Sequence, residues 1–273
     1  MRGLHFMSNP NVWFSLLLLA SALHSELFAA PQSSASKDPS PEISHRESSP
    51  VEARISAAQA NIKAKPNSFA AWNDLAFALC RKGRDTQDPT VYNQAEAALT
   101  HALQLSPGNY EARKLQAAVF LGRHEFTRAL ALATELNRKT PDDIAGWALL
   151  ADANIGLGKY ADAEKQVQWV LDLRPGNTLG FEKAAALRVL FGDVPGAIEF
   201  LDESIRRTSP NDADQHAWLL TEKARLELVS GYNQQAEILL QQALQLFPGS
   251  VHATEILARV RTASAAPQTA LKR

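Results

Sequence analysis

Three short stretches of the sequence hold residue types that could do chemistry. His124-Glu125 begins like the zinc-binding helix of a metalloprotease, but the position four residues after the first His is occupied by Arg128. Gly158-Lys159 matches the end of a phosphate-binding loop, but the glycine expected five residues earlier is absent and Tyr160 replaces the Ser or Thr. Both departures remove groups that the chemistry needs. We therefore predict no catalytic residue and no enzymatic activity.

The metal-binding and redox-active side chains are equally sparse. One cysteine, Cys80, excludes an internal disulfide and a cysteine-based zinc site. Two interpretations of Cys80 stay open: a small half-buried helix residue, or a thiol whose pKa is lowered by Arg81 and Lys82. No i, i+4 pair exists among the scattered histidines at positions 101, 124, 216 and 252. We predict no metal site and no cofactor.

The composition of the 273-residue chain narrows the function classes. Lys and Arg number 28 against 29 Asp and Glu, so the formal net charge is −1 and nothing in it favours binding to a nucleic-acid backbone. Hydrophobic residues make up 45% of the chain, but aromatic residues only 7%. The remaining apolar residues are mainly Ala and Leu, which favour closely packed helices over sheets.

The two ends of the chain differ from the rest. Residues 1–29 have the pattern of a secretory signal peptide: one early charge, an apolar run from Val12 to about Ala22, then small residues. The run is short for a membrane span, although an uncleaved anchor remains the alternative. Residues 30–50 are rich in Pro and Ser, which predicts a disordered linker, and we expect a disordered tail at 267–273. We expect an exported protein, periplasmic or secreted if the source is bacterial, with no membrane span in the mature chain.

A repeating pattern organises residues 51–266. Prolines at 66, 107, 141, 175, 210 and 248 each follow a helix-like segment, and their successive positions differ by 41, 34, 34, 35 and 38. The stretch from Trp147 to Pro175 shows the content of one period most clearly. Leu150 and Ala151 share a helical face with Trp147, a glycine at 158 breaks the chain, and small residues recur in a second helix.

This pattern resembles the tetratricopeptide repeat family. The resemblance implies an all-α fold, a right-handed superhelical solenoid of antiparallel helix pairs, with about five repeat units and single flanking helices at 51–65 and 251–261. It also implies that each pair contacts mainly its neighbours, so that the array has no compact central core. Two stretches depart from the family pattern: the stretch 81–91 is longer than the family turn, and 211–216 is expected to be an extended loop. The excess at 84–91 is either a longer surface loop or an added contact surface.

The family register also implies which side chains face the concave groove of the array, where first helices of successive pairs lie side by side. We expect this groove to bind a protein or peptide partner with apolar anchors, and not nucleic acid or metal. A solvated concave face without a dedicated ligand is the alternative. The predicted groove residues are Asn73, Phe77, Lys114, Ala118, Leu121, Asp152, Ile155, Glu182, Val189, Trp218 and Arg225.

Two functions are compatible with these predictions. The first is a non-enzymatic scaffold for protein–protein interaction that binds a partner polypeptide segment in its groove. The second is an accessory subunit that presents a substrate protein to a separate envelope enzyme, in cofactor maturation or in cell-wall or polysaccharide synthesis. Trp169, on the outer helix of its repeat, is either an interface anchor or a cover for a neighbouring side chain.

Overall fold

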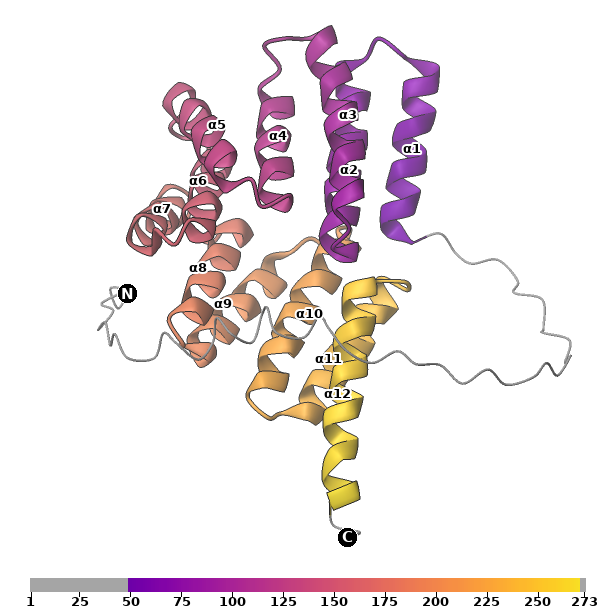
Figure 1. Cartoon of the computed structure of the whole chain (residues 1–273), viewed down its shortest axis with the longest axis vertical. Helices are drawn as coiled ribbons and strands as arrows, with labels where there is room; N and C mark the ends of the chain where they lie inside the picture. The colour runs from indigo at the N-terminus through magenta and orange to yellow at the C-terminus, as the bar shows by residue number, and fades with distance from the viewer. Residues whose placement is uncertain (1–48, 271–273) are drawn as a thin grey trace, which may run out of the picture. The chain divides into compact units, whose positions relative to one another are not determined.

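The computed structural model describes residues 49–270, and all of them belong to one compact unit, Glu47–Arg273. The predicted signal peptide and most of the predicted linker lie outside the described residues. Twelve helices and no strand occur within 49–270 (Figure 1). They are α1 Pro50–Ala64, α2 Phe69–Thr86, α3 Pro89–Leu105, α4 Tyr110–Gly122, α5 Phe126–Lys139, α6 Ile144–Gly156, α7 Tyr160–Leu173, α8 Thr178–Leu190, α9 Val194–Arg207, α10 Ala213–Val229, α11 Asn233–Leu246 and α12 Val251–Ala270.

Local sequence signals set the helix ends. Asn109, Asp143 and Asn177 each place a side-chain oxygen on a backbone N–H of the first turn of α4, α6 and α8, which satisfies a donor that the helix itself leaves free. Glycines with positive φ end the turns inside three of the pairs, at 158, 192 and 231. Consecutive helices connected by such short turns must run antiparallel.

The packing repeats with the sequence period. One alanine in the second helix of each pair is fully buried, at 95, 129, 163, 197 and 236. A second alanine, at 117, 151, 185 and 224 in the first helices, is at most 3% exposed. Because these side chains are methyl groups, the backbones of adjacent helices approach closely. The predicted all-α solenoid of helix pairs is confirmed.

Two of the first helices are longer than the others. α2 has 18 residues and α10 has 17, whereas α4, α6 and α8 have 13 each. The excess residues of the first repeat therefore extend helices, and α2 continues to Thr86 where a surface loop was one expectation. The expectation of an extended loop at 211–216 is wrong, because residues 213–216 form the first turn of α10.

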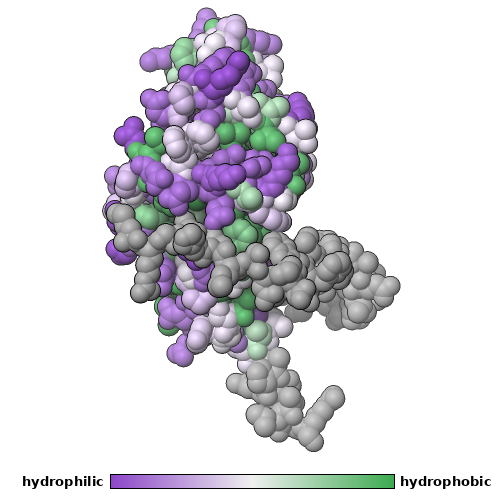
Figure 2. Space-filling model, turned by 90° about the vertical axis from the view of Figure 1, so that its left-hand side faces the viewer, coloured by the Kyte–Doolittle hydropathy of each residue, from purple (hydrophilic) through white to green (hydrophobic). Residues whose placement is uncertain are grey.

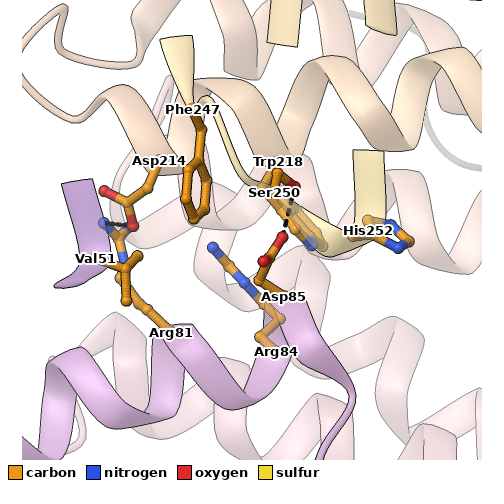
Figure 3. Close-up of a pocket in the computed structure, with 9 residues that line it drawn as sticks. All are labelled: Val51, Arg81, Arg84, Asp85, Asp214, Trp218, Phe247, Ser250 and His252. Carbon is orange, nitrogen blue, oxygen red and sulfur yellow. Dashed lines mark hydrogen bonds and ion pairs between the residues drawn. The ribbon is translucent and has the colours of Figure 1, made fainter. Parts of the chain in front are cut away.

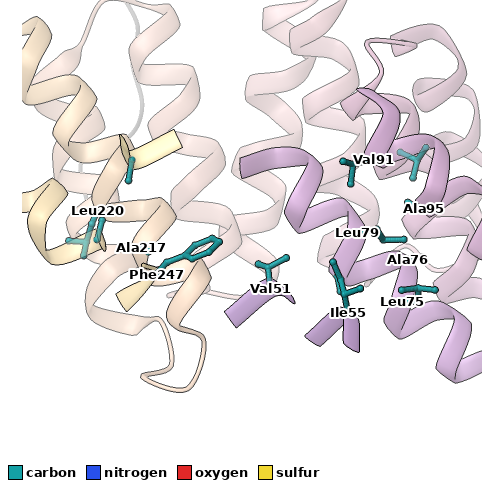
Figure 4. Packing of buried hydrophobic residues seen from close by; sticks show 14 of the residues in the cluster. Val51, Ile55, Leu75, Ala76, Leu79, Val91, Ala95, Ala217, Leu220 and Phe247 are labelled. Atoms are coloured by element: carbon teal, nitrogen blue, oxygen red, sulfur yellow. The ribbon is translucent and has the colours of Figure 1, made fainter. Parts of the chain in front are cut away.

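The array closes on itself. α2 contacts α12 and α1 contacts α10, in addition to the contacts between sequential helices. In Figure 1 the N-terminal end of α1 and the C-terminal end of α2 lie beside α10 and α12. A single cluster of buried apolar residues includes Val51 of α1 together with Ala217 of α10 and Phe247 before α12 (Figure 4). Each pair still contacts mainly its neighbours, as expected, but the two ends of the array also contact each other.

The last helix is also longer than expected. α12 extends to Ala270, whereas we expected the flanking helix to end at Arg261 and a tail to begin at 267. The helix continues through the alanine-rich stretch after Arg261 and has Pro267 in its last turn.

Candidate partner-binding face

A line of polar contacts joins the first helices of successive pairs across the inner side of the array. Asn73 of α2 exchanges hydrogen bonds with Asn109, the residue that caps α4, at 3.3 Å. Lys114 of α4 lies 3.1 Å from Asp143, which caps α6. The ammonium group of Lys183 in α8 lies 2.6 Å from the carboxylate of Asp152 in α6. Each contact links two neighbouring repeats.

The same line continues through the last repeats. Gln215 of α10 donates a hydrogen bond of 2.8 Å to Glu182 of α8. Glu222 of α10 lies 2.7 Å from the imidazole of His252 in α12 and also pairs with Arg225, one turn away on its own helix. The hydrogen bonds and charges from His252 and Arg225 outweigh the effect of burial and hold the pKa of the Glu222 carboxyl below its usual range.

Ion pairs also join the two long helices, α2 and α10, to each other. Arg81 of α2 pairs with Asp214 of α10 at 2.7 Å and with the neighbouring Asp212. Arg54 of α1 reaches both of these carboxylates, at 3.3 and 3.2 Å. The side chain of Asp214 is only 2% exposed. Burial raises the pKa of its carboxyl, and the charges of Arg81 and Arg54 act in the opposite direction. We call this set of contacts between α1–α2 and α10–α12 the clasp.

Arg84, in the extra turn of α2, occupies the centre of the clasp. Its guanidinium carbon lies 4.4 Å from the ring centroid of Trp218, and it donates a hydrogen bond of 2.9 Å to Gln215. Burial and the adjacent Arg81 lower the pKa of Arg84, while the carboxylates of Glu182 and Asp214 act in the opposite direction. Burial also raises the pKa of Glu182. An arginine head therefore lies in a partly desolvated site bounded by an aromatic face and acidic groups.

The clasp is closely packed. Figure 3 shows Arg81, Arg84 and Asp85 of α2 pointing toward Asp214, Trp218 and Ser250. The cavity left between these side chains has a volume of about 10 Å³, the room of about one water molecule. It is a joint between helices and not a pocket for a substrate.

An apolar row runs beside the polar line. Leu121, Ile155, Val189 and Leu228 lie near the C-terminal ends of α4, α6, α8 and α10, and each is half-buried against the core of its own repeat. The first three lie one sequence period apart, so they occupy the same position in successive repeats. Phe77 of α2 is 43% exposed and Leu190 of α8 is 37% exposed.

The predicted groove residues therefore divide into two sets. The polar residues and Trp218 already contact other residues of the chain. The apolar residues keep exposed surface. The guanidinium carbon of Arg81 lies 5.1 Å from the ring centroid of Phe77. The engaged set is Asn73, Lys114, Asp152, Glu182, Trp218 and Arg225, and the remaining set is Phe77, Ala118, Leu121, Ile155 and Val189.

Sequence reasoning missed the residues of the clasp. Arg54, Arg84, Asp85 and Asp214 carry no motif, and none of them was expected to face a distant helix. A signal for them was present in the proline spacings, because the first and last spacings, 41 and 38, exceed the common value of 34. The extra residues belong to the first and last repeats, whose helices α2 and α10 contact each other in the clasp.

The remaining candidates are Cys80, Trp169 and the potential metal ligands. Burial raises the pKa of the Cys80 thiol to about 12, which leaves it protonated at neutral pH and favours the first of its two interpretations. Trp169 is 49% exposed and its ring lies 5.6 Å from that of Trp147, in the position that His101 takes over Trp72 in the first repeat. Across the part of the chain that the structure describes, no group of three or more His, Cys, Asp or Glu is placed to hold a metal ion.

Figure 2, which faces the side of α5 and α7, shows hydrophilic residues interspersed with small hydrophobic patches. No helix among residues 49–270 is long and apolar enough to cross a membrane.

Comparison with known proteins identifies the repeats. Two family models described as tetratricopeptide repeat match residues 92–153 and 149–213. Residues 92–213 are tetratricopeptide repeats. The chain is similar to tetratricopeptide repeat protein 33 of Mus musculus, with 30% identity over 35% of this chain and 37% of the relative. The chain thus spans little more than a third of the length of the curated relatives that it matches.

Solved structures show the same fold. A thermophilic tetratricopeptide repeat protein of Thermus thermophilus matches with a TM-score of 0.55 and 18% identity, over 70% of this chain and 99% of its own. A tetratricopeptide repeat protein from Parabacteroides merdae matches with a TM-score of 0.52 and 14% identity, over 77% and 92%. The two family models begin at α3 and end at α10, so the helices of the clasp lie largely outside the regular repeats.

Proposed function

We propose that this tetratricopeptide repeat protein is a non-enzymatic scaffold that binds a partner polypeptide segment along the apolar row of its inner face. The repeat fold in general supports protein–protein interaction, and its members are typically not enzymes. The observation that carries the finer proposal is the row itself. Leu121, Ile155 and Val189 repeat in step with the helix pairs and remain half-exposed, whereas the polar line beside them is satisfied within the chain.

The spacing of the row suits a chain-like ligand. A side chain from each successive repeat offers one apolar contact, so a partner segment, extended or helical, would place apolar anchors at regular intervals. Half-buried aliphatic side chains on a fixed scaffold lose little conformational freedom on binding, which favours affinity.

Site-specific photocrosslinking tests the proposal. A benzoylphenylalanine residue at position 121, 155 or 189 is expected to crosslink to the same partner protein in cells of the native source. The matched controls place the crosslinker at Ala131, Lys165 and Glu199, which are exposed on the outer helices α5, α7 and α9. Equal crosslinking from the outer positions, or none from the inner row, would contradict the proposal.

The identity of the crosslinked protein separates the two functions. A structural component of an envelope assembly supports the scaffold, and a transferase or maturation enzyme with its substrate supports the accessory role. We further propose export to the periplasm or beyond, on the charge and hydropathy pattern of residues 1–29. Sequencing the N-terminus of the mature protein tests this: a start after residue 20 indicates cleavage, and Met1 indicates that the segment is retained.

A further inference from the structure

One end of the inner face is built to receive arginine. Trp218 provides an aromatic surface, Gln215 provides an acceptor oxygen, and Glu182 and Asp214 provide negative charge around them. Arginine is favoured at such a site over lysine, because its planar guanidinium stacks on rings and donates several hydrogen bonds in fixed directions.

The current occupant of this site is part of the chain itself. Arg84 stacks on Trp218, and both Arg84 and Arg81 donate to the side-chain oxygen of Gln215, at 2.9 and 3.1 Å. Gln215 in turn donates to Glu182. Of the predicted groove residues, Trp218 is therefore engaged directly by Arg84, and Glu182 is linked to it through Gln215.

The contact that places Arg84 there can be broken without unstacking the repeats. In an array of helix pairs each pair is stabilised mainly by its sequential neighbours, and α2 keeps its packing against α1, α3 and α4 when α10 and α12 move away. The clasp itself consists of ion pairs from Arg54 and Arg81 and hydrogen bonds of Arg84 and Asp85. Beside it, Val51 of α1 shares a buried apolar cluster with Ala217 and Phe247, so opening must also separate this apolar contact. Of these pairs, Arg54–Asp212 has both side chains about a third exposed and is open to competing charged groups and to salt, whereas Arg81–Asp214 is buried and is screened less.

We propose that Trp218, Gln215, Glu182 and Asp214 form a docking site for an arginine-bearing partner segment, and that Arg84 is a resident occupant which such a segment displaces, opening the clasp. The proposal deepens the proposed function, on which it rests, by naming the chemistry of the partner at one end of the inner face. Apolar anchors would occupy the row, and an arginine would replace Arg84 at its α10 end.

A peptide copied from α2 is the probe. It spans residues 76–88, with the change Cys80→Ser, and carries a fluorophore. We expect the variant Arg84→Ala to bind this peptide at least tenfold more tightly than the wild-type chain does, measured by fluorescence anisotropy. Arg84→Lys, which keeps the charge but not the planar head, should give a smaller gain. A peptide with both arginines changed to lysine should bind Arg84→Ala at least fivefold more weakly.

Matched controls separate a freed site from a loosened protein. Arg113→Ala also removes a half-buried arginine, which pairs with Glu135 of α5 away from the clasp, and should give no gain. Adding Trp218→Leu to Arg84→Ala should abolish the gain, with far-UV circular dichroism confirming that each variant is folded.

Opening is measured separately. A fluorophore pair placed on exposed residues of α3 and α12 should report a greater separation when the peptide binds, and a disulfide formed between Asp85→Cys and Ser250→Cys should prevent both binding and opening until it is reduced. Unchanged peptide affinity in folded Arg84→Ala, or a gain that survives Trp218→Leu, would overturn the inference. Photocrosslinking from Leu121 and Ile155 does not use these residues, so failure here is distinguishable from failure of the proposed function.

Discussion

The carboxylate of Asp85, in the last turn of α2, caps the first turn of α12. It accepts a hydrogen bond of 3.0 Å from the backbone N–H of Val251 and one of 2.5 Å from the hydroxyl of Ser250. A negative charge at a helix N-terminus satisfies free N–H groups and opposes the positive end of the helix dipole. A helix near one end of the chain thus provides the cap for the helix at the other end.

Replacing Asp85 should therefore weaken the contact between the two ends. We expect Asp85→Ala to lower the free energy of unfolding by about 1–2 kcal/mol, as the loss of a helix cap does, measured by urea denaturation. Asp85→Asn keeps an acceptor oxygen and should cost less. Asp162→Ala, at an exposed position in the first turn of α7, is the control, and an equal loss in that variant would show that the contact with α12 contributes nothing.

Asp143 predicts a dependence of stability on pH. Burial alone would raise its pKa, but hydrogen bonds from Lys114 and from the N–H of Ala145, with the charge of Lys114, hold the pKa below its usual range. A carboxyl whose pKa is lower in the folded state stabilises the protein above its unfolded pKa of about 4 and loses that contribution as the pH falls through the folded pKa.

The variant Asp143→Asn isolates this effect. We expect it to be less stable than the wild type by about 1 kcal/mol at pH 7, because the hydrogen bond to a charged group is lost, and the difference to shrink as the pH is lowered from 5 to 2. Urea denaturation at several pH values measures it. A difference that stays constant over this range would contradict the assignment to the charge of Asp143.

Tyr92 of α3 packs against glycines of two helices, Gly83 of α2 and Gly122 of α4. A Cβ atom at Gly122 would overlap the Tyr92 ring, and one at Gly83 would lie 2.9 Å from it. We expect Gly122→Ala to cost about 1–3 kcal/mol of stability through overpacking, measured by thermal and urea unfolding. Gly108→Ala is the matched control, because no atom lies within 4 Å of its Cβ position. Adding Tyr92→Leu should recover part of the loss, and no recovery would argue against a steric cause.

His124 adopts a conformation that glycine adopts elsewhere. Its φ is 58°, in the turn between α4 and α5, where glycines with φ of 73°, 76° and 86° occupy the turns of three other pairs. A side chain in the left-handed region costs about 1 kcal/mol. We expect His124→Gly to raise the unfolding free energy by about 0.5–1 kcal/mol and Gly158→Ala to lower it by a similar amount. A loss of stability in His124→Gly would show that the ring contact with Phe126 outweighs the backbone strain.

Cys80 should report on folding. Because burial raises its pKa to about 12, the native thiol should react with a disulfide reagent at pH 8 far more slowly than the thiol of the urea-unfolded chain. Absorbance of the released thiolate measures both rates. Similar rates in the two states would show that the thiol is accessible and activated.

Much of the fold could be predicted from the residues alone because repeat packing is local. Trp147, Ala151 and Ala163 each meet side chains within the same or the next repeat, so their spacing carries the information. Capping residues such as Asn109 and Asp143 act within one helical turn, so the signal for a helix start is also local.

The inner face was less predictable. The register placed Asp152, Glu182 and Trp218 on it, but periodicity does not say whether such side chains await a partner or already pair with Lys183, Gln215 and Arg84. Whether two polar side chains pair depends on their lengths and on the distance between their helices, and both differ from position to position.

The repeat period by itself established the helix pairs, their order and the faces that pack. The meeting of Arg81 with Asp214 was decided in three dimensions only, because it depends on small rotations accumulated over the intervening repeats. No local pattern encodes that sum. The longer first and last periods are visible in the sequence. The curvature of the array decides that the extra residues lengthen α2 and α10 toward each other and so close the array.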